Sequence, residues 1–242
     1  MSPLMTGFLL AAACALGWAV LDLLRKALAD RHQDPLTLAA IIPLAAAIGA
    51  TVPGLSAADL LQPPPRELWG LLAGIIVLNV LANFLFLYAL TIGEISSLLP
   101  LLATTPAVGA LGGYLVFGET LTAVNWCGMA LVILGIWRLT GGGVPAGQGV
   151  WVMAAVAVLW GAAPVLDAEV VRRSGWSVTA YVAWVCWLIS IPLMTERLLR
   201  APRKVLVVVR RSPWLCLALV PTAALALGTQ FASLAYLDVG VA

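Results

Sequence analysis

The sequence predicts an all-α polytopic membrane protein: eight transmembrane helices from an inverted five-helix repeat, with the second repeat incomplete. Three observations lead to this fold class. Hydrophobic residues make up 62% of the 242 residues and charged residues only 10%, with a mean hydropathy of +1.04. Long apolar segments follow one another with short connections, and similar residues recur about 145 positions apart. Soluble domains are about half apolar and a quarter charged, so the composition indicates a membrane protein.

The individual helices follow from segment length. A membrane-spanning helix needs about 17–25 mostly apolar residues. Eight segments qualify, namely 4–24, 36–53, 69–90, 96–117, 122–138, 150–167, 178–194 and 214–237. Turn-forming runs such as Pro63–Pro65 and Gly141–Gly143 separate several of them. The connection before the last segment contains RKVLVVVRR, at 203–211, which predicts a short amphipathic helix on the membrane surface.

An internal repeat organises these segments. Asp22 corresponds to Asp167 at an offset of 145, and Asn83 corresponds to Gln230 at an offset of 147. The first unit, residues 1–140, contains five helices, and the second, residues 148–242, contains three. An odd number of helices makes the second unit enter the membrane from the opposite side, as in the inverted repeats of many transporters.

The fourth and fifth segments contain the most specific motif. Its elements are Pro106, the pair Gly118-Glu119, the turn Thr120–Thr122, and Gly128 with Gly135 seven residues later. This pattern resembles the EamA-like branch of the drug/metabolite transporter superfamily. Trp160-Gly161 resembles the Trp-Gly pair of that family's first helix and is reversed as Gly17-Trp18 in the first unit.

The resemblance implies ten helices in two inverted repeats, which move small metabolites or toxic organic compounds across a membrane. Compared with that pattern, helices nine and ten are lacking, so we expect the reading frame to continue past Ala242. Otherwise a homodimer or another partner would complete the missing helices. The resemblance implies a cytoplasmic amino terminus, whereas the distribution of Lys and Arg predicts the reverse orientation. We expect an integral protein of the bacterial cytoplasmic membrane.

Amides within the third and eighth segments are candidates for substrate binding. Asn79 and Asn83 lie one turn apart on one face of a helix near the membrane midplane, and Gln230 is the repeat counterpart of Asn83. Polar side chains at this depth are expected to face protein or a watery cavity. The three amides therefore either bind a polar substrate or hold helices together.

Two tryptophans and a proline-containing motif complete the candidate site. Trp18 and Trp160 can form the wall of the same cavity and attract an organic cation, or serve in packing alone. Thr104 and Thr105 precede Pro106, where a lost backbone donor can break the helix and offer acceptors to a cavity, or simply kink it. Pro164 is a second candidate for a helix break or hinge. Gly118 and Glu119 are expected to form a structural turn.

Ionisable residues and cysteines point to no further chemistry. Asp22 and Asp167 are expected near helix ends at the interface, the first paired with Arg25. Apart from Asp238, we therefore expect no deep carboxylate for proton transfer. The four cysteines are scattered through apolar segments without metal-ligand spacing, so we expect neither a metal nor another cofactor. No basic run with aromatics indicates nucleic acid, so the expected partners are membrane lipid and a small-molecule substrate.

Three functions remain in competition. The favoured one is a secondary transporter, an exporter, in which the two units rock around a midplane site. A non-transporting scaffold or inactive fragment is the second. A membrane enzyme acting on lipid phosphates is the third and is disfavoured, because His32 is the sole histidine and no catalytic motif occurs.

Overall fold

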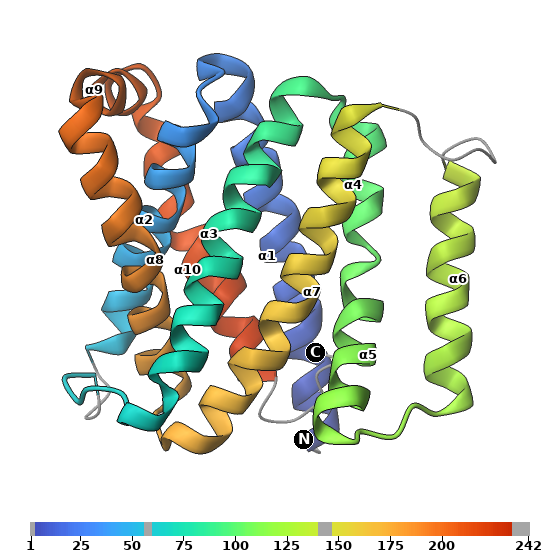
Figure 1. The fold of residues 1–242 in the computed structure, drawn as a ribbon. Coiled ribbons are helices and arrows are strands. Elements are labelled where there is room, and N and C mark those ends of the chain that lie inside the picture. Colours follow the sequence, from blue (N-terminus) through green and yellow to red (C-terminus); the bar gives the residue numbers. More distant parts are fainter. Residues whose placement is uncertain (1–2, 56–59, 140–146, 234–242) are drawn as a thin grey trace.

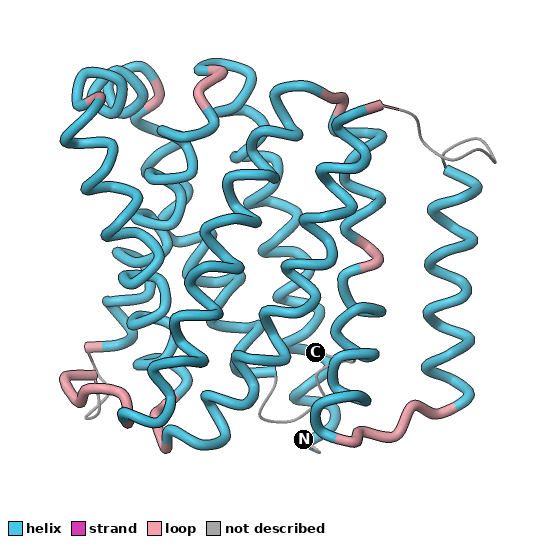
Figure 2. Tube along the Cα trace, viewed as in Figure 1, coloured by secondary structure: helices cyan, strands magenta, loops and turns pink. Residues whose placement is uncertain are grey.

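The computed structural model describes residues 3–55, 60–139 and 147–233, and these ranges consist of helices and turns without a strand (Figures 1 and 2). The elements are α1 (Pro3–His32), α2 (Pro35–Gly54), the 3₁₀ helix η1 (Arg66–Leu68), α3 (Trp69–Ile92), α4 (Ile95–Leu102), α5 (Thr105–Phe117), α6 (Ala123–Leu139), α7 (Gln148–Ser174), α8 (Val178–Arg200), α9 (Pro202–Arg211) and α10 (Pro213–Ser233). The all-α polytopic prediction is confirmed.

Seven helices within the described residues are long and apolar enough to cross a membrane, with α4 and α5 counted together as one span. The expected fifth segment forms α6, which has 17 residues and is shorter than these spans. The surface segment predicted from RKVLVVVRR forms α9, a separate helix between α8 and α10. The Gly141–Gly143 linker, the end of the last predicted segment and Asp238 lie outside the described residues.

Three helices are longer than their apolar stretches predict, and one of them is α8, which continues from the predicted end at residue 194 to Arg200. The first segment was expected to end near residue 24, but α1 continues to His32. The sixth was expected to end at Asp167, but α7 continues to Ser174 and is closed by Gly175 in the left-handed conformation. Hydropathy locates the apolar stretch rather than the end of the helix. Asp22 and Asp167 consequently lie inside helices rather than at their ends.

The helices pack in pairs that join the two halves of the chain. The most extensive contacts are α1 with α10, α2 with α8 and α3 with α7. In Figure 1, α1 and α7 run in opposite directions, as do α2 and α8, and α3 and α10. The expected repeat relates α1 to α7, α2 to α8 and α3 to α10. Exchanging each helix for its counterpart turns the pair α1–α10 into the pair α7–α3 and leaves the pair α2–α8 unchanged.

Small residues allow two of the helix contacts to be close. A Cβ atom on Gly161 of α7 would lie 2.5 Å from Cβ of Val108 on α5. A Cβ atom on Gly17 of α1 would lie 3.0 Å from Cα of Ala226 on α10. Such close approach is the usual packing device of membrane helices, because lipid offers no hydrophobic force between them. The Trp-Gly and Gly-Trp pairs thus place each tryptophan beside a tight helix contact.

Polar contacts fasten α9 to the turn between α1 and α2. Nζ of Lys204 lies 3.0 Å from Oδ2 of Asp34, and Nε2 of His32 lies 2.9 Å from Oγ of Ser212. Asp34 also accepts hydrogen bonds from the backbone N–H and hydroxyl of Thr37, as an N-cap residue of α2 does. The amphipathic helix is therefore held at one end of the bundle.

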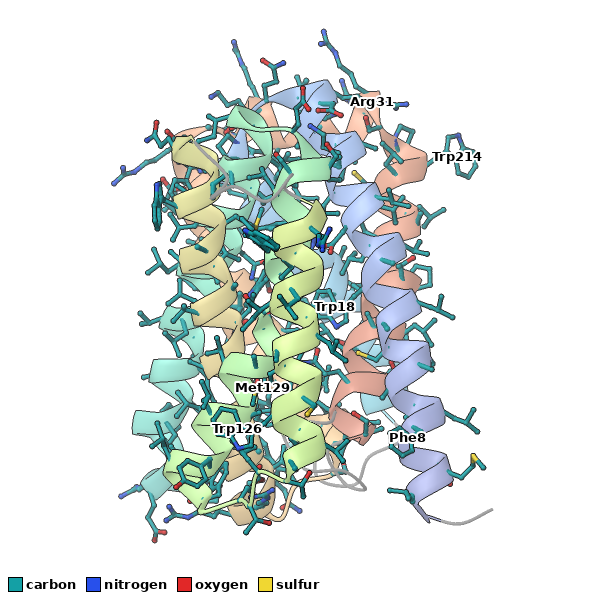
Figure 3. All side chains as sticks on the ribbon, turned by 90° about the vertical axis from the view of Figure 1, so that its right-hand side faces the viewer. Phe8, Trp18, Arg31, Trp126, Met129 and Trp214 are labelled. Carbon is teal, nitrogen blue, oxygen red and sulfur yellow. The ribbon has the colours of Figure 1, made fainter. Side chains whose placement is uncertain are left out.

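Helix α6 stands apart from the remaining helices. Figure 1 shows it beside the bundle, and Figure 3 shows its residues Trp126 and Met129 in front, with Trp18 behind it. Within the described residues its main contact is with α4. Leu131, Ile133 and Leu134 are each more than half exposed. This helix therefore lies at the periphery, away from the cavity described next.

Candidate functional site

A cavity of about 690 Å³ lies among the helices of the two halves. Its walls come from α1, α2, α3, the α4–α5 region, α7, α8 and α10. This volume falls in the range of sites for small organic molecules, about 300–1,000 Å³. Most of the wall is apolar, with a few polar side chains, which is the usual composition of a ligand site.

Most of the residues predicted from the sequence meet at this cavity. Those that line it are Trp18, Asn79, Asn83, Thr105, Pro106, Trp160, Pro164 and Gln230. Thr104 is not among the lining residues, and neither is the Gly118-Glu119 pair, which lies at the far end of α5. The structure thus brings together residues from both halves that are up to 212 positions apart in the chain.

Trp18 and Trp160 form an aromatic cluster with Phe86 of α3. The ring centroids of Trp18 and Trp160 are 6.4 Å apart, and those of Phe86 and Trp160 are 5.0 Å apart. Nε1 of Trp18 donates a hydrogen bond to Oε1 of Gln230 at 3.1 Å. The repeat-related tryptophans therefore lie beside each other in the cavity wall, and both are partly buried.

The hydrogen bonds described for the two asparagines stay within α3. Nδ2 of Asn79 donates to the carbonyl of Ile75 at 3.0 Å, and Nδ2 of Asn83 donates to the carbonyl of Asn79 at 2.8 Å. Among the described residues, no hydrogen bond of these two amides links α3 to another helix. Both residues line the cavity, so their carbonyl oxygens are candidate acceptors for a ligand.

Asp22 and Arg25 form the expected ion pair, but in a different place. Nη1 of Arg25 lies 3.1 Å from Oδ1 of Asp22, and both residues line the cavity. The side chain of Arg25 is only 6% exposed and that of Asp22 only 15%, so the expectation of an interfacial pair is wrong. The reason is that α1 continues for ten residues beyond Asp22. The guanidinium also lies against the rings of Trp18, Phe86 and Trp160.

Asp167 is a deep carboxylate that the sequence interpretation excluded. It is buried, lines the cavity and accepts a hydrogen bond from the hydroxyl of Tyr181 on α8. The ring of Tyr181 packs edge-on against Phe231 of α10, with centroids 5.2 Å apart. No ion pair to Asp167 is present among the described residues. The expectation of an interfacial position is wrong because α7 continues two turns beyond this residue.

The fourth segment is broken where the Thr-Thr-Pro motif predicts it. Helix α4 ends at Leu102 and α5 begins at Thr105, and Figure 2 shows the interruption as a short loop within the span. Oγ1 of Thr104 donates to the carbonyl of Leu101 at 2.6 Å. Pro106 has no N–H to continue the first helix, and this is the physical cause of the break. The break borders the cavity through Thr105 and Pro106.

Pro164 and the Gly118-Glu119 pair have different surroundings. Helix α7 passes through Pro164 without interruption, so the structure has no break at this candidate hinge. Gly118 adopts the left-handed conformation (φ 67°) and closes α5, as glycine does at many helix ends. The carboxylate of Glu119 pairs with Nη2 of Arg172 on α7 at 3.3 Å. The turn thus links α5 to α7. The start of α6 is capped by hydrogen bonds between Thr122 and Asn125.

Sequence reasoning missed Arg25 and Asp167, which line the cavity. It also missed Tyr181 and Phe86, which contact the lining residues Asp167 and Trp160 from behind. The signal for Asp167 was present, because its offset of 145 from Asp22 is within two residues of the offset of 147 between Asn83 and Gln230. Tyr181 and Phe86 lie in apolar runs that no motif distinguishes. Within the described residues, no group of three or more histidine, cysteine or acidic side chains is placed to hold a metal ion.

Comparisons with known proteins agree with this architecture. The model of the EamA-like transporter family matches residues 5–141, more than half of the chain. A crystal structure of another protein superposes with a TM-score of 0.68 at 19% sequence identity, covering 99% of this chain and 82% of that one. At this identity the likeness concerns the fold alone. No curated protein matches the sequence.

Proposed function

Because the chain belongs to the EamA-like transporter family, we propose that it is a secondary transporter that exports small metabolites or other small organic compounds. It is an integral membrane protein of the drug/metabolite transporter class, and the family consists of transporters rather than enzymes. We further propose the bacterial cytoplasmic membrane as its location.

The cavity is the observation that carries this proposal. It joins helices of both halves, has the volume of a small-molecule site, and combines apolar walls with amide, indole and charged groups. We propose that Asn79, Asn83, Thr105 and Gln230 bind polar groups of the substrate, while Trp18 and Trp160 contact its apolar body. Thr104 acts indirectly, through the break that positions Thr105.

We propose alternating access as the mechanism, with residues 1–140 and 148–242 as two inverted units. The opposite directions of α1 and α7 and the pairing of α1–α10 with α3–α7 support this division. The broken span at Pro106 borders the cavity and is the point where we expect the backbone to bend during exchange. Pro164, within a continuous helix, is the weaker candidate for a hinge.

Membrane lipid and the transported compound are the partners that we propose, together with a second copy of the chain or another protein that packs against the bundle. The alternative of a non-transporting scaffold is less well supported, because a scaffold has no need of charged groups around a cavity. The cost of placing such groups in a membrane favours a function for them.

The test is transport by purified protein in liposomes. Vesicles loaded with a panel of unlabelled metabolites are diluted into the same radiolabelled compounds, and exchange is measured against empty liposomes. Replacing Asn83 or Gln230 with Leu should reduce the exchange several-fold at unchanged protein content. If the wild-type protein exchanges none of a broad panel, the transporter proposal is wrong, and unchanged exchange by both variants would leave these amides with a packing role.

A further inference from the structure

Arg25 brings a positive charge to the cavity wall and leaves part of its hydrogen-bonding capacity unused. The residue is only 5% exposed and lines the cavity two turns after Trp18 on α1. Among the described residues, Nη1 donates to Asp22, while Nε is buried without any partner. An arginine has five N–H donors, and a buried donor without an acceptor is unfavourable. The described part of the chain therefore provides no acceptor for Nε of this guanidinium.

Aromatic rings surround the guanidinium but cannot supply that acceptor. Its central carbon lies 5.1 Å from the ring centroid of Trp18, 5.4 Å from that of Phe86 and 5.5 Å from that of Trp160. Ring faces attract a cation by their quadrupole. The N–H bonds of arginine point outward in the plane of the group, so a hydrogen-bonding ligand must approach at its edge.

The chemistry of the missing acceptor follows from this geometry. A planar guanidinium pairs best with a carboxylate, whose two oxygens match its forked donors. The rest of the cavity is mainly apolar, with indole rings beside Arg25. We infer that Arg25 binds the carboxylate of the transported compound, and that the substrates are small organic acids with an apolar or aromatic body. This inference rests on the proposed transport function and names its substrate class.

Asp22 acts as a competitor in this arrangement. Its Oδ1 accepts from Nη1 of Arg25, and its side chain is 15% exposed within the cavity wall. Asp22 neutralises the arginine when no substrate is bound, and an entering carboxylate competes for the same donors. Removal of the negative charge at position 22 should therefore strengthen anion binding, whereas removal of the positive charge at position 25 should weaken it.

Asp167 also lines the cavity, from α7 rather than α1. Arg25 follows Trp18 by seven residues and Asp167 follows Trp160 by seven, which places each about 10 Å along its helix. Since α1 and α7 run in opposite directions, the two backbone positions lie on opposite sides of the Trp18–Trp160 contact. The guanidinium of Arg25 reaches back to these rings, and no ion pair joins it to Asp167 among the described residues.

The experiment measures equilibrium binding of radiolabelled benzoate to the purified full chain in detergent. Unlabelled benzylamine and benzyl alcohol are competitors of the same ring size with a positive charge and no charge. The variants are Arg25→Gln, Arg25→Lys and Asp22→Asn. Arg31→Gln is the matched control, because Arg31 lies on the same helix, is exposed and is remote from the cavity.

We expect saturable benzoate binding that the two competitors displace poorly. Arg25→Gln should weaken it about tenfold or more, from loss of a charged hydrogen-bonding partner. Arg25→Lys should have a smaller effect, Asp22→Asn should strengthen binding several-fold, and Arg31→Gln should leave it unchanged. The opposite effects at positions 22 and 25 separate ligand binding from a purely structural ion pair, for which both variants would weaken binding alike.

Three results would overturn the inference: no saturable benzoate binding by the wild type, equal binding by Arg25→Gln and Arg31→Gln, or preferential displacement by benzylamine. If Arg25→Gln does not fold, Arg25→Lys and Asp22→Asn still give opposite predictions. The outcome is independent of the transport test. Binding without exchange would contradict the transport proposal alone, and exchange without Arg25-dependent benzoate binding would contradict this inference alone.

Discussion

Nε1 of Trp18 and Oε1 of Gln230 are joined by a hydrogen bond of 3.1 Å, which connects α1 to α10 across 212 positions of the chain. Both residues also line the cavity. One bond therefore belongs to a helix contact and to the cavity wall at once, so its loss should affect both stability and transport.

Replacing Gln230 with Leu should leave the indole N–H of Trp18 without its acceptor. We expect a loss of about 1–3 kcal/mol in stability, because a partly buried donor becomes unsatisfied. Thermal unfolding in detergent measures this loss. Thr222→Val is the control on the same helix, since Thr222 donates to the carbonyl of Ala218 in its own helix and does not line the cavity. Equal effects of the two variants would show that the Trp18–Gln230 bond contributes nothing specific.

Replacing Pro106 with Ala should restore a backbone donor at the break between α4 and α5. We expect a more continuous helix, with transport slowed several-fold and thermal stability maintained, because the new N–H can bond to a carbonyl one turn earlier, whereas Pro106 itself occupies the first turn of α5, where proline is tolerated. Exchange rates in liposomes measure the first effect and thermal unfolding the second. Pro100→Ala, within α4, is the control. If the Pro106 variant transports as fast as the wild type, the break between α4 and α5 has no role in transport.

Replacing Tyr181 with Phe should remove the described hydrogen-bond donor to the buried carboxylate of Asp167. We expect a destabilisation of about 1–3 kcal/mol, because a buried acceptor is left unsatisfied. Asp167→Asn should cost less, since the amide oxygen still accepts from the tyrosine hydroxyl. In the double variant the two effects should be non-additive when unfolding is compared in a double-mutant cycle. Simple additivity would contradict a direct interaction.

Replacing Gly113 with Ala should disturb the ion pair between Glu119 and Arg172. A Cβ atom at position 113 would lie 2.3 Å from Oε2 of Glu119, so the carboxylate must move. We expect a loss of about 1 kcal/mol or more, beyond the gain that alanine usually brings to a helix. Gly128→Ala is the control, because nothing lies within 4 Å of its added Cβ, and it should be neutral or stabilising. Thermal unfolding compares the two, and a stabilised Gly113→Ala would refute the steric argument.

Stability should fall in acid partly through Asp34. Partial burial alone would raise the pKa of Asp34, but hydrogen bonds from Lys204 and Thr37 outweigh it and hold that pKa below its ordinary value. The contribution of Asp34 to the free energy of unfolding is therefore complete above the ordinary aspartate pKa of about 3.9. It is lost as the pH falls through the lower pKa that Asp34 has in the folded protein. Lys204→Met should reduce this acid-dependent loss, as measured by unfolding temperatures from neutral pH to below pH 4. The same pH dependence in both proteins would exclude the Lys204 contact as its cause.

The sequence predicted the fold class and much of the cavity because both depend on patterns that membranes impose. Apolar length located the helices, and the repeat offset linked Asn83 with Gln230. The proline of the fourth segment located the break. These features are local or periodic, so they can be read without coordinates.

The charged part of the cavity was beyond the same reasoning. Hydropathy ended the first and sixth segments at residues 24 and 167, close to their first charged residues, which placed Asp22 and Asp167 at the interface. In the structure, Arg25 neutralises one carboxylate and Tyr181 donates to the other, so both helices continue. The partner of Asp167 lies 14 residues away on another helix, and no spacing rule predicts it.

The peripheral helix α6 has a consequence for the surrounding bilayer. Its 17 residues span about 25 Å, whereas the hydrocarbon core of a typical bilayer is about 30 Å thick. A short membrane-spanning helix at the periphery of a bundle is accommodated by local thinning of the bilayer, alongside snorkelling of its flanking side chains. Phospholipids with shorter acyl chains should therefore gather along α6. The thickness of the bilayer should accordingly affect the position of this helix more than that of the others.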